Sequence, residues 1–264
     1  MDILEKIVLN KRKEVAIRKQ LIPMQNLERA DLFHKSTSSL KNALRNSTTG
    51  IIAEYKRRSP SKAVINQNAY VQEVALGYKN AGVCGISVLT DGHFFGGSLH
   101  DLLIARGTVQ IPLLRKEFII DEYQIIEAKA HGADVILLIA AILTREEIAN
   151  FAKLAHELQM EVLLEVHNEE ELRHALLPDL DMIGVNNRNL KTFEVALETS
   201  TSLASQIPSE FVKVSESGIS SVNAVQQLRQ AGYQGFLMGE TFMASEDPGS
   251  SATQFIENIV TVSY

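Results

Sequence analysis

The sequence predicts a (β/α)8 barrel preceded by a helical extension, and three observations support this prediction. From Ile51 onward, short apolar runs alternate with polar stretches of helical period. The runs are continuous, which is typical of parallel strands covered by helices. Eight runs occur, and the 216 residues from position 49 to the end provide 27 for each, about one strand–helix unit. We therefore expect one domain, 1–264, in which residues 1–48 form the extension.

The helical extension comes first in the chain. We expect an amphipathic helix over residues 2–20, since apolar side chains recur at helical spacing and Pro23 follows. Its apolar side is expected to hold Ile3, Leu4, Ile7, Val8, Val15 and Ile17. Acidic Glu5 and Glu14 interrupt the basic character around residues 11–13, so we assign that run to a solvated face rather than to an anionic partner. A second short helix is predicted over 36–46, capped by Ser36 or Thr37.

The predicted strands then follow at regular intervals. In chain order they are Ile51–Tyr55, Gly85–Leu89, Pro112–Leu114, Val135–Ile139, Val162–Val166, Met182–Val185, Phe211–Ser215 and Gly235–Met238. Helix-periodic stretches separate them, among them Asp121–His131, Arg145–Leu158 and Asn168–Leu177. An open doubly wound sheet is the alternative, but it normally has a Gly-rich turn after its first strand. The charged residues 54–61 stand there instead, which favours the barrel.

Composition excludes several classes of protein. The chain has 26 Lys and Arg against 32 Asp and Glu, a net charge of −6, which argues against a nucleic-acid partner. No apolar stretch approaches the roughly 20 residues of a membrane span, and the N-terminus does not resemble a signal peptide, so we expect a cytoplasmic protein without a membrane partner. The one cysteine, Cys84, is expected to be a small buried hydrophobe. The histidines lack metal-ligand spacing, so no metal site is expected.

Charged residues stand near the carboxyl ends of several predicted strands, where (β/α)8 barrels place their chemistry. Glu54 and Lys56 are two residues apart, so they face the same way. Lys116 follows the third strand, and Glu165 lies inside the apolar fifth strand, where an unpaired carboxylate would be unfavourable. The alternative for Glu165 is a structural ion pair that braces the barrel. Together these residues predict a polar site lined by acids and bases.

Further polar residues and glycines follow the sixth, seventh and eighth strands. They are Asn186, Arg188, Glu216, Ser217, Gly218, Gly239 and Glu240. Barrels often hold phosphate on backbone N–H groups after strands seven and eight, and glycine lets the backbone approach an anion closely. We therefore expect a small phosphorylated substrate. We also expect the chain to be a monomer. A P-loop or GxGxxG motif is absent, so no nucleotide cofactor is expected.

Taken together, these segments resemble the indole-3-glycerol phosphate synthase family. The matching segments are residues 53–61 (AEYKRRSPS), 87–90 (SVLT), 94–98 (FFGGS), 114–118 (LRKEF), 165–166 (EV), 184–190 (GVNNRNL) and 215–219 (SESGI). The resemblance implies a (β/α)8 barrel with a helical extension and a lyase of tryptophan biosynthesis. The family reaction converts 1-(2-carboxyphenylamino)-1-deoxyribulose 5-phosphate to indole-3-glycerol phosphate, with loss of carbon dioxide and water.

The resemblance also implies roles for individual residues. Lys116 looks like the general acid that protonates the substrate carbonyl oxygen in ring closure, and Glu165 like the base or acid of the dehydration. Lys56 resembles the lysine that contacts the substrate carboxylate. The remaining roles are orientation by Glu54, Asn186 and Glu216, polar lining by Ser59 and Arg188, and a phosphate cradle from Ser217, Gly218 and Gly239, with Glu240 beside it.

The sequence departs from the family pattern at a few positions. Glu117 stands where the family usually has Asp, Ala63 replaces a usual Gly, and residues 239–243 are bulkier than usual. No cofactor is implied, because carbon dioxide can leave after ring closure without an electron sink. One electrostatic question stays open: repulsion between the two lysines lowers their pKa values, whereas Glu54, Glu165 and Glu216 raise them.

Two other kinds of function fit the same residues. One is another phosphosugar lyase or isomerase, or a Schiff-base aldolase of phosphosugars with Lys116 or Lys56 as nucleophile. The other is a barrel that binds a phosphorylated metabolite without catalysis. The charged residues at the first, third and fifth strands favour an enzyme, because simple phosphate binding would not need them.

Overall fold

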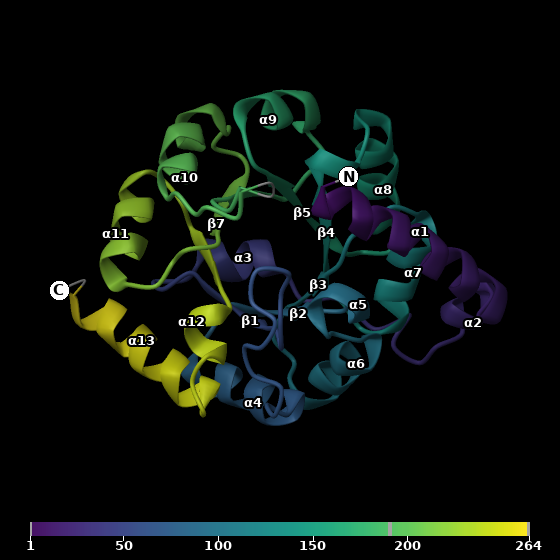
Figure 1. The fold of residues 1–264 in the computed structure, drawn as a ribbon, viewed down its shortest axis with the longest axis horizontal. Coiled ribbons are helices and arrows are strands. Elements are labelled where there is room, and N and C mark those ends of the chain that lie inside the picture. Colours follow the sequence, from purple (N-terminus) through teal and green to yellow (C-terminus); the bar gives the residue numbers. More distant parts are fainter. Residues whose placement is uncertain (1, 190–191, 263–264) are drawn as a thin grey trace.

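Eight parallel strands form a closed barrel in the computed structural model, which describes residues 2–189 and 192–262 (Figure 1). Each strand pairs with the next along the chain, and the last pairs with the first. The strands are β1 Ile51–Tyr55, β2 Gly85–Leu89, β3 Leu113–Lys116, β4 Val135–Ile139, β5 Glu161–Val166, β6 Met182–Asn186, β7 Val212–Glu216 and β8 Gly235–Met238. The predicted (β/α)8 barrel is therefore confirmed.

The strand bounds agree with prediction to within two residues, and four strands match fully. Three strands run further than their apolar runs, to Lys116, Asn186 and Glu216. Pairing across the ladder explains the extension, because Lys116 lies opposite Leu89 and Glu216 lies opposite Asn186. Each of these polar residues is thus the last residue of its strand, where backbone hydrogen bonding still holds it in the sheet.

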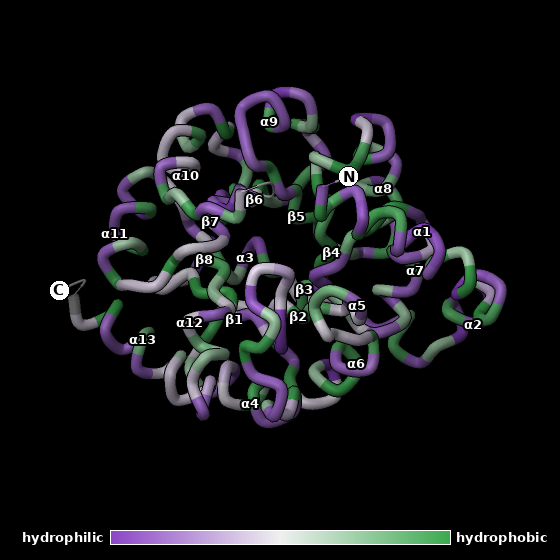
Figure 2. The backbone as a smooth tube through the Cα atoms, in the orientation of Figure 1, coloured by the Kyte–Doolittle hydropathy of each residue, from purple (hydrophilic) through white to green (hydrophobic). Residues whose placement is uncertain are grey.

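Helices surround the barrel and bury the outer face of the strands (Figure 1). The main ones are α4 Val71–Ala81, α6 Leu99–Thr108, α7 Glu122–Ala130, α8 Arg145–Glu157, α9 Glu169–Ala175, α10 Glu198–Leu203, α11 Val222–Gln230 and α13 Pro248–Val262. Short elements accompany them: α5 Gly92–Phe95, η1 Ala140–Ile142, η2 Ala204–Gln206 and α12 Glu240–Met243. Helix α13 packs against α4, which closes the ring. Hydrophobic residues concentrate in the strands, and hydrophilic ones lie on the outer turns (Figure 2).

The N-terminal extension consists of α1 Ile3–Leu21, α2 Met24–Glu28 and α3 Leu40–Arg45. Helix α3 closes one end of the barrel, where Leu40 and Leu44 pack among the first residues of the strands. The prediction placed its start too early: Ser39 is the cap, and its Oγ accepts a hydrogen bond from the Asn42 amide at 3.0 Å. Helix α1 lies beside α7, on the outside of the barrel (Figure 1).

Helix α1 differs from its prediction in which side chains it buries. The buried line is Ile7, Lys11 and Val15, spaced four residues apart, whereas Ile17 is 57% exposed. The assignment of the basic run 11–13 to a solvated face was therefore wrong for Lys11, because buried carboxylates surround its ammonium group. Cys84 is buried and free, as expected. No helix in the described ranges is long and apolar enough to cross a bilayer.

Candidate active site

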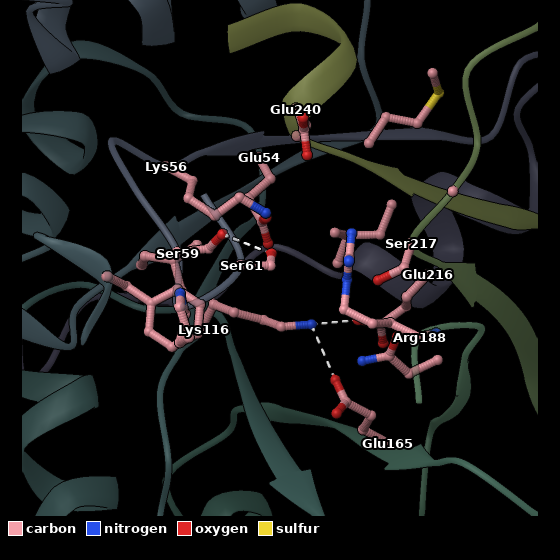
Figure 3. Close-up of a pocket in the computed structure, with 18 of the residues that line it drawn as sticks. Glu54, Lys56, Ser59, Ser61, Lys116, Glu165, Arg188, Glu216, Ser217 and Glu240 are labelled. Carbon is pink, nitrogen blue, oxygen red and sulfur yellow. Dashed lines mark hydrogen bonds and ion pairs between the residues drawn. The ribbon is translucent and has the colours of Figure 1, made fainter. Parts of the chain in front are cut away.

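A cavity of about 510 Å³ opens at the carboxyl ends of the strands (Figure 3). All twelve residues singled out from the sequence line it: Glu54, Lys56, Ser59, Lys116, Glu165, Asn186, Arg188, Glu216, Ser217, Gly218, Gly239 and Glu240. They come from segments up to 186 positions apart, and the closed barrel brings them together because all its strands end on the same side.

Glu54 and Lys56 face the cavity from β1 as an ion pair. Their Oε1 and Nζ atoms are 2.7 Å apart, as the two-residue spacing predicts. Ser87 donates a hydrogen bond of 3.1 Å to the other oxygen of Glu54. Burial opposes ionisation of Glu54, but the charges of Lys56 and Lys116 outweigh it and lower its pKa. Glu54 is therefore an ionised carboxylate in the wall of the cavity.

Lys116 reaches from the end of β3 into the middle of the cavity (Figure 3). Its Nζ lies 3.2 Å from Glu165 Oε2 and also forms an ion pair with Glu216. Burial favours the neutral amine, but the negative charges of Glu216, Glu165 and Glu54 prevail and raise the pKa of Lys116 above its usual value. This answers the question that the sequence left open, since the carboxylates dominate and Lys116 is an ammonium ion.

Glu165 and Glu216 share the Lys116 ammonium, but their pKa values shift in opposite directions. Burial raises the pKa of Glu165, but Lys116, His167 and a hydrogen bond from Asn186 outweigh it, so the net pKa is lowered. Burial and the nearby charges of Glu165 and Glu54 raise the pKa of Glu216 to about 7. Close carboxylates cannot all be ionised at low cost, so Glu216 is the weaker acid of the two and the first to take up a proton as pH falls.

Two glycines make room for these carboxylates. A Cβ atom on Gly184 of β6 would lie 2.4 Å from Glu216 Oε1, and one on Gly239 would lie 2.7 Å from Glu54 Oε1. Side-chain atoms do not approach so closely, so a side chain at either position would force the neighbouring carboxylate to move. Sequence analysis missed Gly184 and considered Gly239 only for phosphate. The alternation of strand residues could have placed Gly184 beside Glu165, because the two are register partners.

The turn after β7 has an unusual backbone. Ser217 and Gly218 both have positive φ, 68° and 75°. The side-chain amide of Asn187 holds the turn by donating to the Ser217 carbonyl at 3.0 Å. In the described part of the chain, no group accepts a hydrogen bond from the backbone N–H of Gly218, Ile219 or Gly239. Unpaired backbone donors at the end of a strand are suited to bind an anion.

The loop after β1 forms the rim of the cavity. Arg57 binds Asp101 through two hydrogen bonds of 2.7 Å, which tie the loop to α6. Ser59 lies further along this loop, and Lys62 binds Glu240 at 2.8 Å across the rim. Ala63, one of the departures from the family pattern, is exposed in the same loop.

An apolar wall of the cavity was missed by the sequence analysis. It consists of Ile3, Leu4 and Ile7 from α1, Phe95 and Phe118 after β2 and β3, and Leu137 and Ile139 of β4. The rings of Phe95 and Phe118 are 5.7 Å apart. Spacing could have indicated Leu137 and Ile139, which lie two residues apart in a strand. No sequence pattern shows that α1 reaches the cavity.

Glu117, another departure from the family pattern, pairs with the N-terminal extension. Its Oε1 lies 3.1 Å from Nζ of Lys11, and its Oε2 accepts a hydrogen bond of 2.8 Å from Thr90. Lys11 also contacts Asp91 at 3.0 Å.

Arg188 donates a hydrogen bond to the Phe193 carbonyl at 3.2 Å. Leu190, which ends the segment that matches the family, lies outside the described residues. No group of three or more acidic, histidine or cysteine side chains in the described ranges is arranged to hold a metal ion.

Comparison with known proteins identifies the relatives of this chain. The family model for indole-3-glycerol phosphate synthase matches residues 4–255. An indole-3-glycerol phosphate synthase of Bacteroides thetaiotaomicron is 50% identical over 98% of this chain and 99% of its own length. One from Polynucleobacter asymbioticus is 42% identical, covering 96% and 98%.

Solved structures show the same fold at low sequence identity. The 3-hexulose-6-phosphate synthase of Salmonella typhimurium is 14% identical, with a TM-score of 0.64 over 80% of this chain and 99% of the other. A thiamine phosphate pyrophosphorylase of Pyrococcus furiosus is 15% identical, with a TM-score of 0.60 over 84% and 100%. At such identity the likeness concerns the barrel alone.

Proposed function

This chain belongs to the indole-3-glycerol phosphate synthase family, and we propose that Lys116 is the centre of its active site. The family reaction, a step of tryptophan biosynthesis, closes a ring, releases carbon dioxide and then removes water. The observation that carries the proposal is a buried ammonium group in the middle of the cavity, surrounded by three carboxylates.

Ring closure joins an aryl carbon to the carbonyl carbon of the substrate and builds negative charge on the carbonyl oxygen. An ammonium group stabilises that charge and supplies the proton, and a low-dielectric site strengthens both effects. The ion pairs with Glu165 and Glu216 hold the Lys116 ammonium in the cavity, where it can face the carbonyl oxygen of the bound substrate. We assign to Lys56, which projects beside Glu54, the contact with the substrate carboxylate.

Dehydration then removes the hydroxyl group that ring closure created. One proton must reach the leaving oxygen, and another must leave the new ring. Lys116 and Glu165 are 3.2 Å apart and can exchange these protons, with Glu216 holding an additional proton near neutral pH. Glu54 and Asn186 orient the lysines and Glu165.

The rest of the substrate fits the rest of the cavity. The apolar wall around Phe95 and Phe118 suits an aromatic ring. The unpaired backbone donors of Gly218, Ile219 and Gly239 suit the phosphate, with Ser217 in the same turn. Ser59, Arg188 and Glu240 line the polar rim between these two regions.

The electrostatics also weigh against the alternative functions. A Schiff-base lysine must lose its proton to act as a nucleophile. The carboxylates around Lys116 raise its pKa instead, which suits an acid and disfavours that chemistry. A simple phosphate-binding barrel would not need three buried glutamates, which are costly unless paired or functional.

We further propose that the enzyme works as a cytoplasmic monomer. All groups of the proposed site come from one chain, and its single cysteine is unpaired, as is common in reducing compartments. Size-exclusion chromatography with light scattering tests the oligomeric state, and a mass near twice 29.2 kDa would contradict it.

Indole fluorescence provides a direct test of the reaction. The chain has no Trp, so product emission would rise against a weak tyrosine background. Purified protein is mixed with 1-(2-carboxyphenylamino)-1-deoxyribulose 5-phosphate without metal or nucleotide. We expect emission to increase with the wild type and with Lys153→Ala, whose side chain is exposed on α8, and to be nearly abolished in Lys116→Ala. Normal turnover by Lys116→Ala would exclude Lys116 as the acid.

A further inference from the structure

A partly buried chain of charged groups extends from Glu165 away from the cavity. Nε2 of His167 lies 3.3 Å from Glu165 Oε1, while Nδ1 of the same ring lies 3.1 Å from Glu171 Oε2. The His167 side chain is 10% exposed and does not line the cavity. It therefore contacts the carboxylate oxygen of Glu165 that Lys116 does not contact.

The local structure explains why these groups meet. His167 directly follows β5, two residues after Glu165, and its ring lies within reach of the Glu165 carboxylate. Asn168 caps α9 by accepting a hydrogen bond from the Glu171 amide at 2.9 Å. This cap places Glu171 in the first turn, where its Oε2 also accepts a hydrogen bond of 2.8 Å from the His167 backbone. The His167 ring is thus held at the backbone and at Nδ1.

Each oxygen of Glu165 consequently faces a different cation. Oε2 faces Lys116 at 3.2 Å and Oε1 faces His167 at 3.3 Å. Burial favours a neutral imidazole, but Glu165 and Glu171 outweigh it and raise the pKa of His167 to about 10. Beyond Glu165 the next charged groups are Lys116 and Glu216, and η1, which packs against α9, has no ionisable side chain.

We propose that His167, anchored by Glu171, is a positioning residue that orients the Glu165 carboxylate and keeps it ionised during catalysis. The inference rests on the proposed function, in which Lys116 gives its proton to the substrate. At that moment Lys116 becomes neutral, and Glu165 loses the cation on Oε2. The imidazolium on Oε1 remains, so Glu165 stays a carboxylate of fixed direction, ready to accept the proton of the next step.

Steady-state kinetics from pH 5.5 to 9 test this role with three variants. His167→Gln keeps a donor of similar reach but removes the charge. Its kcat should fall by roughly tenfold or more with KM changed less than about twofold. The acid limb of kcat should move up by about one pH unit, because removing the imidazolium charge raises the apparent pKa of the coupled Glu165 and Glu216 carboxylates. Glu171→Gln should move the limb in the same direction by less. His156→Gln is the control, because its ring pairs with Asp181 at 2.9 Å and neither residue lines the cavity.

The pH profile separates positioning from a merely structural role. A lower yield of folded His167→Gln with unchanged kcat and acid limb per folded molecule would overturn the proposal. If His167→Gln does not fold, Glu171→Gln still decides, because it retains the imidazole and alters only its anchor. An acid limb identical to that of the wild type in Glu171→Gln would then refute the role of the anchored ring.

A titration that needs no turnover completes the test. In ¹⁵N-histidine spectra of the wild type, the ring signal that is missing in His167→Gln should stay in the imidazolium form above pH 8. Glu165→Gln should lower the midpoint of that signal by at least about one unit. A midpoint near the ordinary histidine value, insensitive to Glu165→Gln, would overturn the pairing. A wild type that shows the titration but no turnover would refute the proposed function and, with it, the role in catalysis.

Discussion

Replacing Lys11 by Met should lower the free energy of unfolding by about 3–5 kcal/mol, although Lys11 lies in the N-terminal extension and does not line the cavity. Its Nζ contacts Glu14 at 2.8 Å, Asp91 at 3.0 Å and Glu117 at 3.1 Å. Asp91 and Glu117 are almost fully buried. Methionine would preserve much of the volume of the lysine stem but leave these carboxylates without their cation.

The magnitude follows from the geometry. Two unit charges about 3 Å apart attract by roughly 5 kcal/mol at an effective dielectric constant of about 20. Three such contacts exceed the several kcal/mol that desolvation of the ammonium costs. Burial opposes the charge, but Glu117, Asp91 and Glu14 prevail and raise the pKa of Lys11. The stabilisation is therefore complete below the ordinary lysine pKa near 10.5 and is lost only as pH rises through the raised value.

Urea unfolding at pH 7.5 is the appropriate assay, because the full effect is present there. Lys13→Met is the matched control, since Lys13 is exposed on the same helix and should change stability by less than about 0.5 kcal/mol. Adding Glu117→Gln to Lys11→Met should recover part of the loss. Equal stability of Lys11→Met and Lys13→Met would refute the reasoning, because it would mean that the buried ion pairs contribute nothing net.

Three further predictions concern the cavity. Glu216→Gln should stabilise the protein by up to about 3 kcal/mol at pH 8 but not below pH 4.5. The folded state raises the pKa of Glu216 to about 7, so the ionised carboxylate destabilises it increasingly as pH rises from about 4.5 to above 7. Urea unfolding at both pH values measures this difference. Gly184→Ala should lower kcat at least about tenfold, since the new Cβ would displace Glu216 by roughly an ångström. Gly218→Ala should raise KM several-fold with little effect on kcat, because its positive φ and a Cβ 2.2 Å from Val195 Cγ1 would distort the phosphate turn.

Each of these has a matched control and a contradicting result. Glu210→Gln changes an exposed carboxylate and should leave stability unaltered at both pH values; equal behaviour of Glu216→Gln would contradict its buried charge. A Cβ atom on Gly107 of α6 would contact nothing, so Gly107→Ala should keep full kcat. Full kcat in Gly184→Ala would contradict the prediction for that position. Gly82 also has positive φ but nothing near its Cβ, so Gly82→Ala should cost stability without raising KM. A similar KM in Gly218→Ala would rule out the turn as the phosphate site.

Much of the candidate site could be predicted from the sequence, because the strands of a parallel barrel all end on the same side. Once eight strands are expected, residues after each strand must meet at one end, however far apart they lie in the chain. Glu54 of β1 and Glu216 of β7 illustrate this, since both line the same cavity although they are far apart in the chain. Their roles remain proposals, but their grouping required only the order and phase of the strands.

Lys11 and His167 show what this reasoning could not reach. Lys11 occupies the buried line of α1 between Ile7 and Val15, but a lysine at such a position is ordinarily assigned to solvent. Only the docking of α1 beside Asp91 and Glu117 shows why its burial is favourable. The sequence analysis assigned no role to His167, because the cap that brings Glu171 to its ring depends on how α9 begins.

The barrel, the phase of its strands and the residues at their carboxyl ends could be predicted from patterns along the chain. These features follow from local periodicity, which expresses how each segment buries its apolar side. The pKa shifts of Lys116 and Glu216, the partners of Lys11 and the part of the apolar wall provided by α1 could be found only in the folded structure. The reason is physical: interactions between charges and contacts across a cavity depend on distances of a few ångströms between segments remote in the chain, and those distances exist only after packing.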